Sequence, residues 1–131
     1  MKTEADFNNW NIIKKETDSF GSKNFKHGEV YWCRLGVNIG VEIDGKGQEY
    51  LRPIIVLKKF SNECLLAAPI TTKLHVGNWY YKIKIQDKDC EVVLIQIKLI
   101  DSKRLTQKSI CQLSNRKIRK ILRRYKILIS T

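Results

Sequence analysis

Several features that would assign this sequence to a class at once are missing from it. It contains no run of about 18 apolar residues, so no membrane-spanning helix is predicted. No apolar segment follows Met1-Lys2, so no secretory signal is expected. The four cysteines, at positions 33, 64, 90 and 111, form no CxxC pair, and the two histidines add no ligand spacing. We therefore predict no metal site. Cys33, Cys64 and Cys111 each neighbour apolar residues, and we interpret them as small buried side chains in a reducing cytosol, with disulfides as the alternative.

Nucleotide-binding signatures are also missing, although the segment 36–51 is rich in glycine. Its glycines stand in neither a strand–GxGxxG–helix order nor a GxxxxGK[ST] order, so no nucleotide cofactor is expected. Asp44-Gly45 is a turn signal within this segment. Loops of this length in a compact domain tend to be functional or mobile, so the segment is a candidate part of a site.

Acidic residues are missing from the C-terminal segment. Residues 1–30 have a net charge of zero and residues 31–101 of +2, whereas residues 102–131 hold ten basic residues and no acidic ones. The last segment therefore supplies +10 of the total of +12. This imbalance favours a polyanionic partner such as nucleic acid, an acidic protein segment or an anionic surface. The alternative is a solvated helix face.

The residues that are present predict one mainly β domain. A chain of 131 residues with 43% hydrophobic residues has the size and composition of a single domain with a core. Alternating and β-branched patterns predict a small, strongly bent antiparallel sheet or barrel. The expected strands are 29–35, 53–58, 64–70, 79–85 and 91–97, with a turn at 87–89 and a short strand or turn near 109–112.

Two helices are predicted, one at each end of the chain. Residues 4–17 have apolar side chains at helical spacing, and this short amphipathic helix is expected to pack outside the core or to bind a partner. Ser114 is placed to cap the second helix. One face of that helix is apolar and the rest is cationic. The apolar face is formed by Ile118, Ile121, Leu122, Tyr125 and Ile129.

Arg52-Pro53 opens the most apolar strand pattern of the chain. Proline has no N–H to donate to a neighbouring strand, so Pro53 belongs at the start of a strand or at a sheet edge. Arg52 is therefore expected where a loop meets the sheet, and functional side chains are often held there. An ordinary solvated surface arginine is the alternative.

Six segments in the same order resemble the PemK/MazF family of toxins from bacterial toxin–antitoxin pairs. The resemblance covers about residues 25–128, and residues 1–24 are interpreted as an N-terminal extension to a domain spanning 25–131. Each motif is weak alone, and the specificity comes from their order and spacing. The segments are GEVYW at 28–32, NIGVE with DGKG at 38–47, RPIIVL at 52–57, PITTK at 69–73, VLIQI at 93–97 and IDSKRL at 100–105.

This resemblance implies a compact SH3-like barrel with a C-terminal helix, a homodimer, a cognate antitoxin and a cytoplasmic location. It implies sequence-selective cleavage of single-stranded RNA without metal or other cofactor. By position, the family's catalytic arginine and threonine correspond to Arg52 and Thr71. The family's QIR segment is Gln96-Ile97-Lys98 here. Lysine keeps the charge of arginine but lacks the planar fork that binds phosphate with two bonds.

The chemistry of RNA cleavage suits these residue types. RNA carries its own nucleophile, the 2′-OH, and Arg52 and Thr71 could stabilise the charge that develops on the phosphate. Attack by the 2′-OH leaves a 2′,3′-cyclic phosphate and a 5′-OH. A guanidinium is a poor general base, whereas histidine has an intrinsic pKa closer to neutrality. His75 is therefore an auxiliary candidate, or else an ordinary loop histidine. Thr72, Gln96 and Lys98 are further auxiliary candidates.

RNA would also need contacts outside the reacting centre that bind its phosphates and stack on its bases. Lys46, Lys58 and Lys73 are the expected phosphate contacts in the loops. Trp79 and Tyr80 are candidates for stacking on bases, although aromatic residues of a small barrel also serve as core.

Two other classes stay open at this point. One is a non-catalytic member of the same fold that binds nucleic acid or a protein target such as a topoisomerase. The other is an SH3-like module that docks peptides, which would need a row of exposed aromatic residues. The presence of both Arg52 and Thr71 favours the nuclease over the first, and the glycine-rich loop and basic tail favour it over the second.

Overall fold

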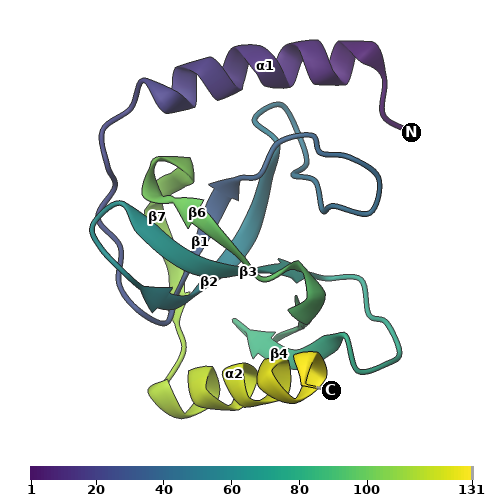
Figure 1. Cartoon of the computed structure of the whole chain (residues 1–131), viewed down its shortest axis with the longest axis vertical. Helices are drawn as coiled ribbons and strands as arrows, with labels where there is room; N and C mark the ends of the chain where they lie inside the picture. The colour runs from purple at the N-terminus through teal and green to yellow at the C-terminus, as the bar shows by residue number, and fades with distance from the viewer. Residues whose placement is uncertain (131) are drawn as a thin grey trace.

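A computed structural model describes residues 1–130, which form an antiparallel sheet with one helix on each of two opposite sides of it (Figure 1). The strands follow the order β4-β5-β3-β2-β1-β7, and β6 pairs with β3. The expected fold class is thus confirmed, except that β4 and β7 end the described path, so the sheet is open and not a closed barrel. The elements are α1 Glu4–Asp18, β1 Glu29–Arg34, β2 Leu51–Lys59, β3 Cys64–Thr71, β4 Tyr80–Ile85, β5 Lys88–Val93, β6 Lys98–Asp101, β7 Leu105–Gln112 and α2 Asn115–Ile129.

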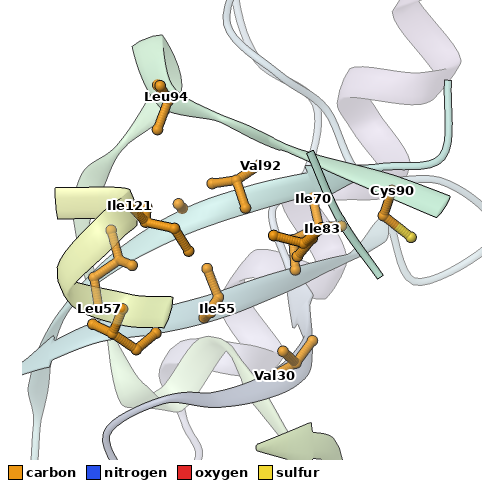
Figure 2. Packing of buried hydrophobic residues seen from close by; sticks show 11 residues of the cluster. Val30, Ile55, Leu57, Ile70, Ile83, Cys90, Val92, Leu94 and Ile121 are labelled. Atoms are coloured by element: carbon orange, nitrogen blue, oxygen red, sulfur yellow. The ribbon is translucent and has the colours of Figure 1, made fainter. Parts of the chain in front are cut away.

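The larger core lies between the sheet and α2 (Figure 2). Ile118 and Ile121 of α2 are buried against apolar side chains of β2, β3 and β5. Burying side chains of this size contributes about 1.5–3 kcal/mol each, which fixes the helix against the sheet. The Ser114 hydroxyl accepts a hydrogen bond from the N–H of Lys117, so the expected cap is confirmed.

A second core lies under the α1 side of the sheet. It contains Tyr31 and Cys33 from β1, Ile54 and Val56 from β2, and Leu65 from β3. Successive residues of a strand point to opposite faces, so β2 supplies both cores: Ile55 and Leu57 face α2, whereas Ile54 and Val56 face this core. Because both faces of β2 are covered, its apolar run is continuous and does not alternate.

The N-terminal helix is held by a capping box and by one buried aromatic ring. Thr3 and Asp6 exchange hydrogen bonds at its start. Trp10 is only 6% exposed and meets the ring of Tyr50 edge-on, with centroids 5.8 Å apart. Gly36 has φ +83°, and a Cβ there would lie 2.1 Å from the Trp10 ring. Only glycine therefore allows the helix to lie this close to the loop 36–50.

The largest error of sequence interpretation concerns β5. A strand at 91–97 was expected after a turn at 87–89, but β5 spans Lys88–Val93 and a 3-10 helix follows at Leu94–Gln96. The turn is instead made by Gln86 and Asp87, which have φ of +52° and +65°. Positive φ at both central residues matches the right-handed twist of a tight hairpin. Similarly, β7 begins at Leu105, earlier than the expected strand near 109–112.

Two smaller expectations are also corrected. Ile129 was assigned to the apolar face of α2 but is 60% exposed, and Leu128 packs against the core in its place. The four cysteines are free, but of the three interpreted as buried only Cys33 is, whereas Cys64 and Cys111 are partly exposed. Burial raises the pKa of the Cys33 thiol to about 12, so this side chain stays neutral in the folded protein.

Candidate active site

The ends of β2 and β3 form a pocket of about 480 Å³ that holds both Arg52 and Thr71. Ile54 pairs with Pro69 and Ile55 with Ala68, and continuing this register by two residues places Arg52 opposite Thr71. Side chains of directly opposite residues stand on the same face of a sheet. The two residues that the sequence singled out are therefore neighbours in space. The rest of the lining is Trp32, Lys46, Gly47, Leu51, Pro53, Ile70 and Thr72.

The Arg52 guanidinium is hydrogen-bonded to the backbone of the loop 36–50. Its Nε–H donates to the Asp44 carbonyl oxygen at 2.7 Å. This leaves the two terminal amino groups for a ligand, in the paired geometry that matches phosphate oxygens. Burial lowers the pKa of Arg52, while the Asp44 carboxylate acts in the opposite direction.

Side chains form several bonds with the loop 36–50. Asn38 donates from its side-chain amide to the carbonyls of Leu35 and Ile43, and its N–H donates to the Asp44 carboxylate at 2.7 Å. The other Asp44 oxygen forms an ion pair with Lys2, at 3.3 Å, and Lys2 also bonds the Asn38 carbonyl. The N-terminal segment thus contacts the loop that positions Arg52.

Neither Gln96 nor Lys98 lines the pocket, and Gln96 bonds the loop that holds Arg52. The Gln96 side chain accepts from the N–H of Ile43 at 3.2 Å and donates to the carbonyl of Val41 at 2.9 Å. Lys98 on β6 pairs with Ala67 of β3 and is half-buried. Burial lowers the pKa of Lys98, and the nearby positive charge of Arg104 lowers it further. Gln96 therefore acts on the site through the loop.

Thr71 ends β3, and its hydroxyl accepts a hydrogen bond from the N–H of Lys73 at 3.2 Å. This bond fixes the side chain and leaves the hydroxyl hydrogen to donate toward a ligand. Thr72 and Lys46 line the same pocket and are exposed. Of the candidates named from the sequence, the pocket therefore brings together Arg52, Thr71, Thr72 and Lys46.

The remaining candidates for RNA contact lie outside this pocket. Lys58 is exposed near the far end of β2, six residues from Arg52, which is about 20 Å along a strand. Lys73 is exposed in the loop after Thr71. Trp79 is 54% exposed, so the core interpretation of this aromatic is wrong. Tyr80 is partly buried and stacks on His75.

A buried carboxylate beside Thr71 was missed from the sequence. Glu91 of β5 pairs directly with Thr71 and is only 1% exposed. Its Oε1 accepts hydrogen bonds from the N–H of His75 at 2.8 Å and lies 3.1 Å from His75 Nδ1. The only sequence signal was one acidic residue at the start of an otherwise apolar run. The strand registers thus place Arg52, Thr71 and Glu91 side by side in one row across β2, β3 and β5.

The cationic residues of α2 form a separate surface. All seven are exposed, and within residues 1–130 none of them takes part in an ion pair. Among them only Arg124 stacks on a ring, that of Tyr81, at 5.8 Å. This surface carries charge without fixed partners. It consists of Arg116, Lys117, Arg119, Lys120, Arg123, Arg124 and Lys126.

Two searches of the described residues were negative. Across residues 1–130, His, Cys, Asp and Glu nowhere gather in a group of three or more that could hold a metal ion. In the same part of the chain, no helix is long and apolar enough to cross a membrane.

Comparisons with known proteins give a family for the sequence and a solved structure of similar fold. The family model of PemK-like, MazF-like toxins of type II toxin–antitoxin systems matches residues 26–129. Among solved structures, an endoribonuclease in complex with its cognate antitoxin, from Mycobacterial species, aligns with a TM-score of 0.59 and 14% sequence identity. That alignment covers 82% of this chain and 99% of the other. No curated protein matches the sequence.

Proposed function

The chain belongs to the family of PemK-like, MazF-like toxins of type II toxin–antitoxin systems, and we propose that it acts as an endoribonuclease on single-stranded RNA. The observation that carries this proposal is the meeting of Arg52 and Thr71 in one pocket at the ends of β2 and β3. α1 lies before the matched residues, so we treat residues 1–24 as an extension to the family domain.

The proposed reaction uses the nucleophile that RNA itself carries. The 2′-OH attacks the adjacent phosphorus, the bond from phosphorus to the 5′-oxygen breaks, and the products are a 2′,3′-cyclic phosphate and a 5′-OH. Arg52 presents its two terminal amino groups to the phosphate oxygens, where negative charge increases in the transition state. The Thr71 hydroxyl donates to the same oxygens. No step in this scheme requires a metal ion.

The pocket also offers a place for the flanking nucleotide. Trp32 is 43% exposed and lines the pocket with Pro53 and Leu51, and flat apolar surfaces of this kind bind unpaired bases by stacking. Lys46 lies on the loop side of the same pocket, within reach of a neighbouring phosphate. These contacts favour single-stranded RNA, because a paired base is not free to turn into such a pocket.

The partners follow from the same proposal. A cognate antitoxin would have to cover the pocket to block cleavage, and the exposed cations of α2 suit an acidic segment of such a partner. We also expect a homodimer, because one pocket of this size contacts only a short piece of RNA and a two-fold dimer would join two such pockets. The expected cytoplasmic location rests on the family resemblance. Light scattering at micromolar concentration should give twice the chain mass, and a monomer mass would contradict the dimer.

Cleavage in EDTA is the direct test of the proposed function. The purified protein is incubated with a long, weakly structured transcript in excess EDTA, and the new ends are mapped by sequencing. We expect discrete cuts whose upstream fragments end in a 2′,3′-cyclic phosphate. Tight binding of the transcript without any cut would instead favour a non-catalytic nucleic-acid-binding member of the fold. Cleavage that stops when EDTA is added would refute metal independence.

A further inference from the structure

The Glu91 carboxylate is buried at the edge of the proposed site without full compensation. It is 1% exposed, and its Oε2 has no hydrogen-bond partner among the described residues. A buried carboxylate with an unpaired oxygen is costly, because the charge has left water without equivalent partners. A glutamine could accept the same bond from the loop backbone at lower cost. A carboxyl group at this position therefore points to a role beyond tethering the loop.

His75 is oriented by this carboxylate in two ways. The backbone N–H of His75 donates to Glu91 Oε1 at 2.8 Å, and the ring Nδ1 lies 3.1 Å from the same oxygen. When the Glu91 carboxylate is ionised it can only accept a hydrogen bond, and in that state Nδ1 carries the hydrogen. This tautomer leaves the Nε2 lone pair free. The Tyr80 ring stacks on the imidazole with centroids 4.2 Å apart and an angle of 3° between the planes, which holds its orientation.

The position of this pair links it to the pocket. Glu91 pairs directly with Thr71, and Thr71 lines the pocket with Arg52. Neighbouring strands therefore present Arg52, Thr71 and Glu91 in one row, and His75 contacts the Glu91 end of that row. About one third of the His75 side chain is exposed, so the ring is accessible to a ligand.

We propose that His75 is the general base of this site and that Glu91 is the residue that positions it. This proposal rests on the ribonuclease function proposed above. His75 Nε2 takes the proton of the 2′-OH while O2′ forms its bond to phosphorus. The electron pair of the broken bond goes to the 5′-oxygen, which takes a proton from water. The imidazolium then returns its proton to solvent, so the histidine is regenerated.

His75→Ala separates catalysis from structure, because it removes the ring but keeps the backbone N–H that bonds Glu91. Single-turnover cleavage is measured on an oligonucleotide that contains a mapped cut site, and affinity is measured on its non-cleavable 2′-deoxy analogue. We expect the rate to fall on the order of a hundredfold, in the range typical of a lost general base, with unchanged affinity. Added free imidazole should restore part of the rate. His27→Ala, which changes the other histidine of the chain, is the matched control.

Glu91→Gln tests the positioning role, with the exposed Glu63→Gln as its control. Nitrogen NMR of the His75 ring should show the hydrogen on Nδ1 in the wild type and a mixture of tautomers in Glu91→Gln. The cleavage rate should fall at least tenfold, with KM little changed. Circular dichroism and thermal unfolding report whether this variant folds. If it does not, the NMR spectrum of the wild-type His75 ring and the imidazole rescue of folded His75→Ala decide the proposal.

Three outcomes would overturn the dyad: a wild-type rate in His75→Ala, a slow His75→Ala that imidazole does not rescue, or a wild-type His75 with its hydrogen on Nε2. In each case the wild-type protein would still cleave RNA, so the proposed function would stand. If the wild-type protein cleaves no RNA, the proposed function itself is wrong.

Discussion

Positive charge is held in two different ways in this molecule. Arg52 is half-buried, its Nε–H is bonded to the Asp44 carbonyl, and the loop that carries this carbonyl is itself pinned by Asn38 and Gln96. The cations of α2 are exposed on long side chains, and none of the described ones is ion-paired. A fixed charge can stabilise one transition state, whereas a mobile set of charges attracts any polyanion. We therefore propose that the pocket carries the chemistry and that the helix supplies long-range attraction.

Arg52→Ala should have the largest effect. Removing the fixed charge is expected to lower the single-turnover rate by on the order of a hundredfold or more, which is about 2.7 kcal/mol or more in the barrier. Affinity for the non-cleavable analogue should change much less. Arg116→Ala removes an exposed charge from α2 and is the matched control. Equal reductions of the single-turnover rate in the two variants would show that the pocket charge has no specific role in the reaction.

Thr71→Val should have the next largest effect. Valine keeps the shape of the side chain but removes the hydroxyl that we expect to donate to the phosphate. The rate should fall on the order of tenfold or more, since a lost hydrogen bond to a charged group is worth about 1.5–3 kcal/mol. Thr71→Ser should retain most of the activity. If Thr71→Val cleaves at the wild-type rate, the hydroxyl has no role in the reaction.

Replacing Arg119, Arg123 and Arg124 with glutamine tests whether the cations of α2 attract RNA. Binding through phosphates releases counterions, so affinity falls steeply as salt rises, and removing contacts makes this dependence shallower. We expect the triple variant to bind RNA less tightly and with a smaller salt slope, while the rate at saturating RNA stays near that of the wild type. Unchanged affinity and slope would assign this face to an antitoxin or to solvent, and RNA guidance to Lys46, Lys58 and Lys73.

Lys2→Gln should have the smallest effect. Lys2 forms an ion pair with Asp44, whose carbonyl holds Arg52, but this pair is partly exposed, and such pairs contribute about 0–1 kcal/mol. We expect a rate reduction of a few-fold at most, with an unchanged melting temperature. A reduction as large as that of Arg52→Ala would mean that the N-terminal segment controls the site and does not merely support it.

Much of this arrangement could be predicted from the sequence because its signals are local. The apolar run after Pro53 marks β2, and Ser114 followed by apolar residues at helical spacing marks α2. Arg52 and Thr71 could be paired through the family resemblance, and the strand register supports that pairing.

What could not be predicted depends on contacts between distant parts of the chain. The hairpin turn at Gln86-Asp87 lacks the glycine or asparagine usual for positive φ, so the start of β5 was misplaced. That error hid the pairing of Glu91 with Thr71. The bonds that hold the loop 36–50 join it to Lys2 and Gln96, and no periodicity in the sequence predicts such contacts.

The measurement that tests the central claim most directly is cleavage of an oligonucleotide with one 2′-OH replaced by hydrogen at the mapped scissile nucleotide. If the 2′-OH is the nucleophile, the substituted RNA should bind in the Arg52 pocket with wild-type affinity and remain uncut in EDTA. The unsubstituted strand should yield a 2′,3′-cyclic phosphate under the same conditions. Cutting of the substituted strand at the same position would contradict the proposed mechanism.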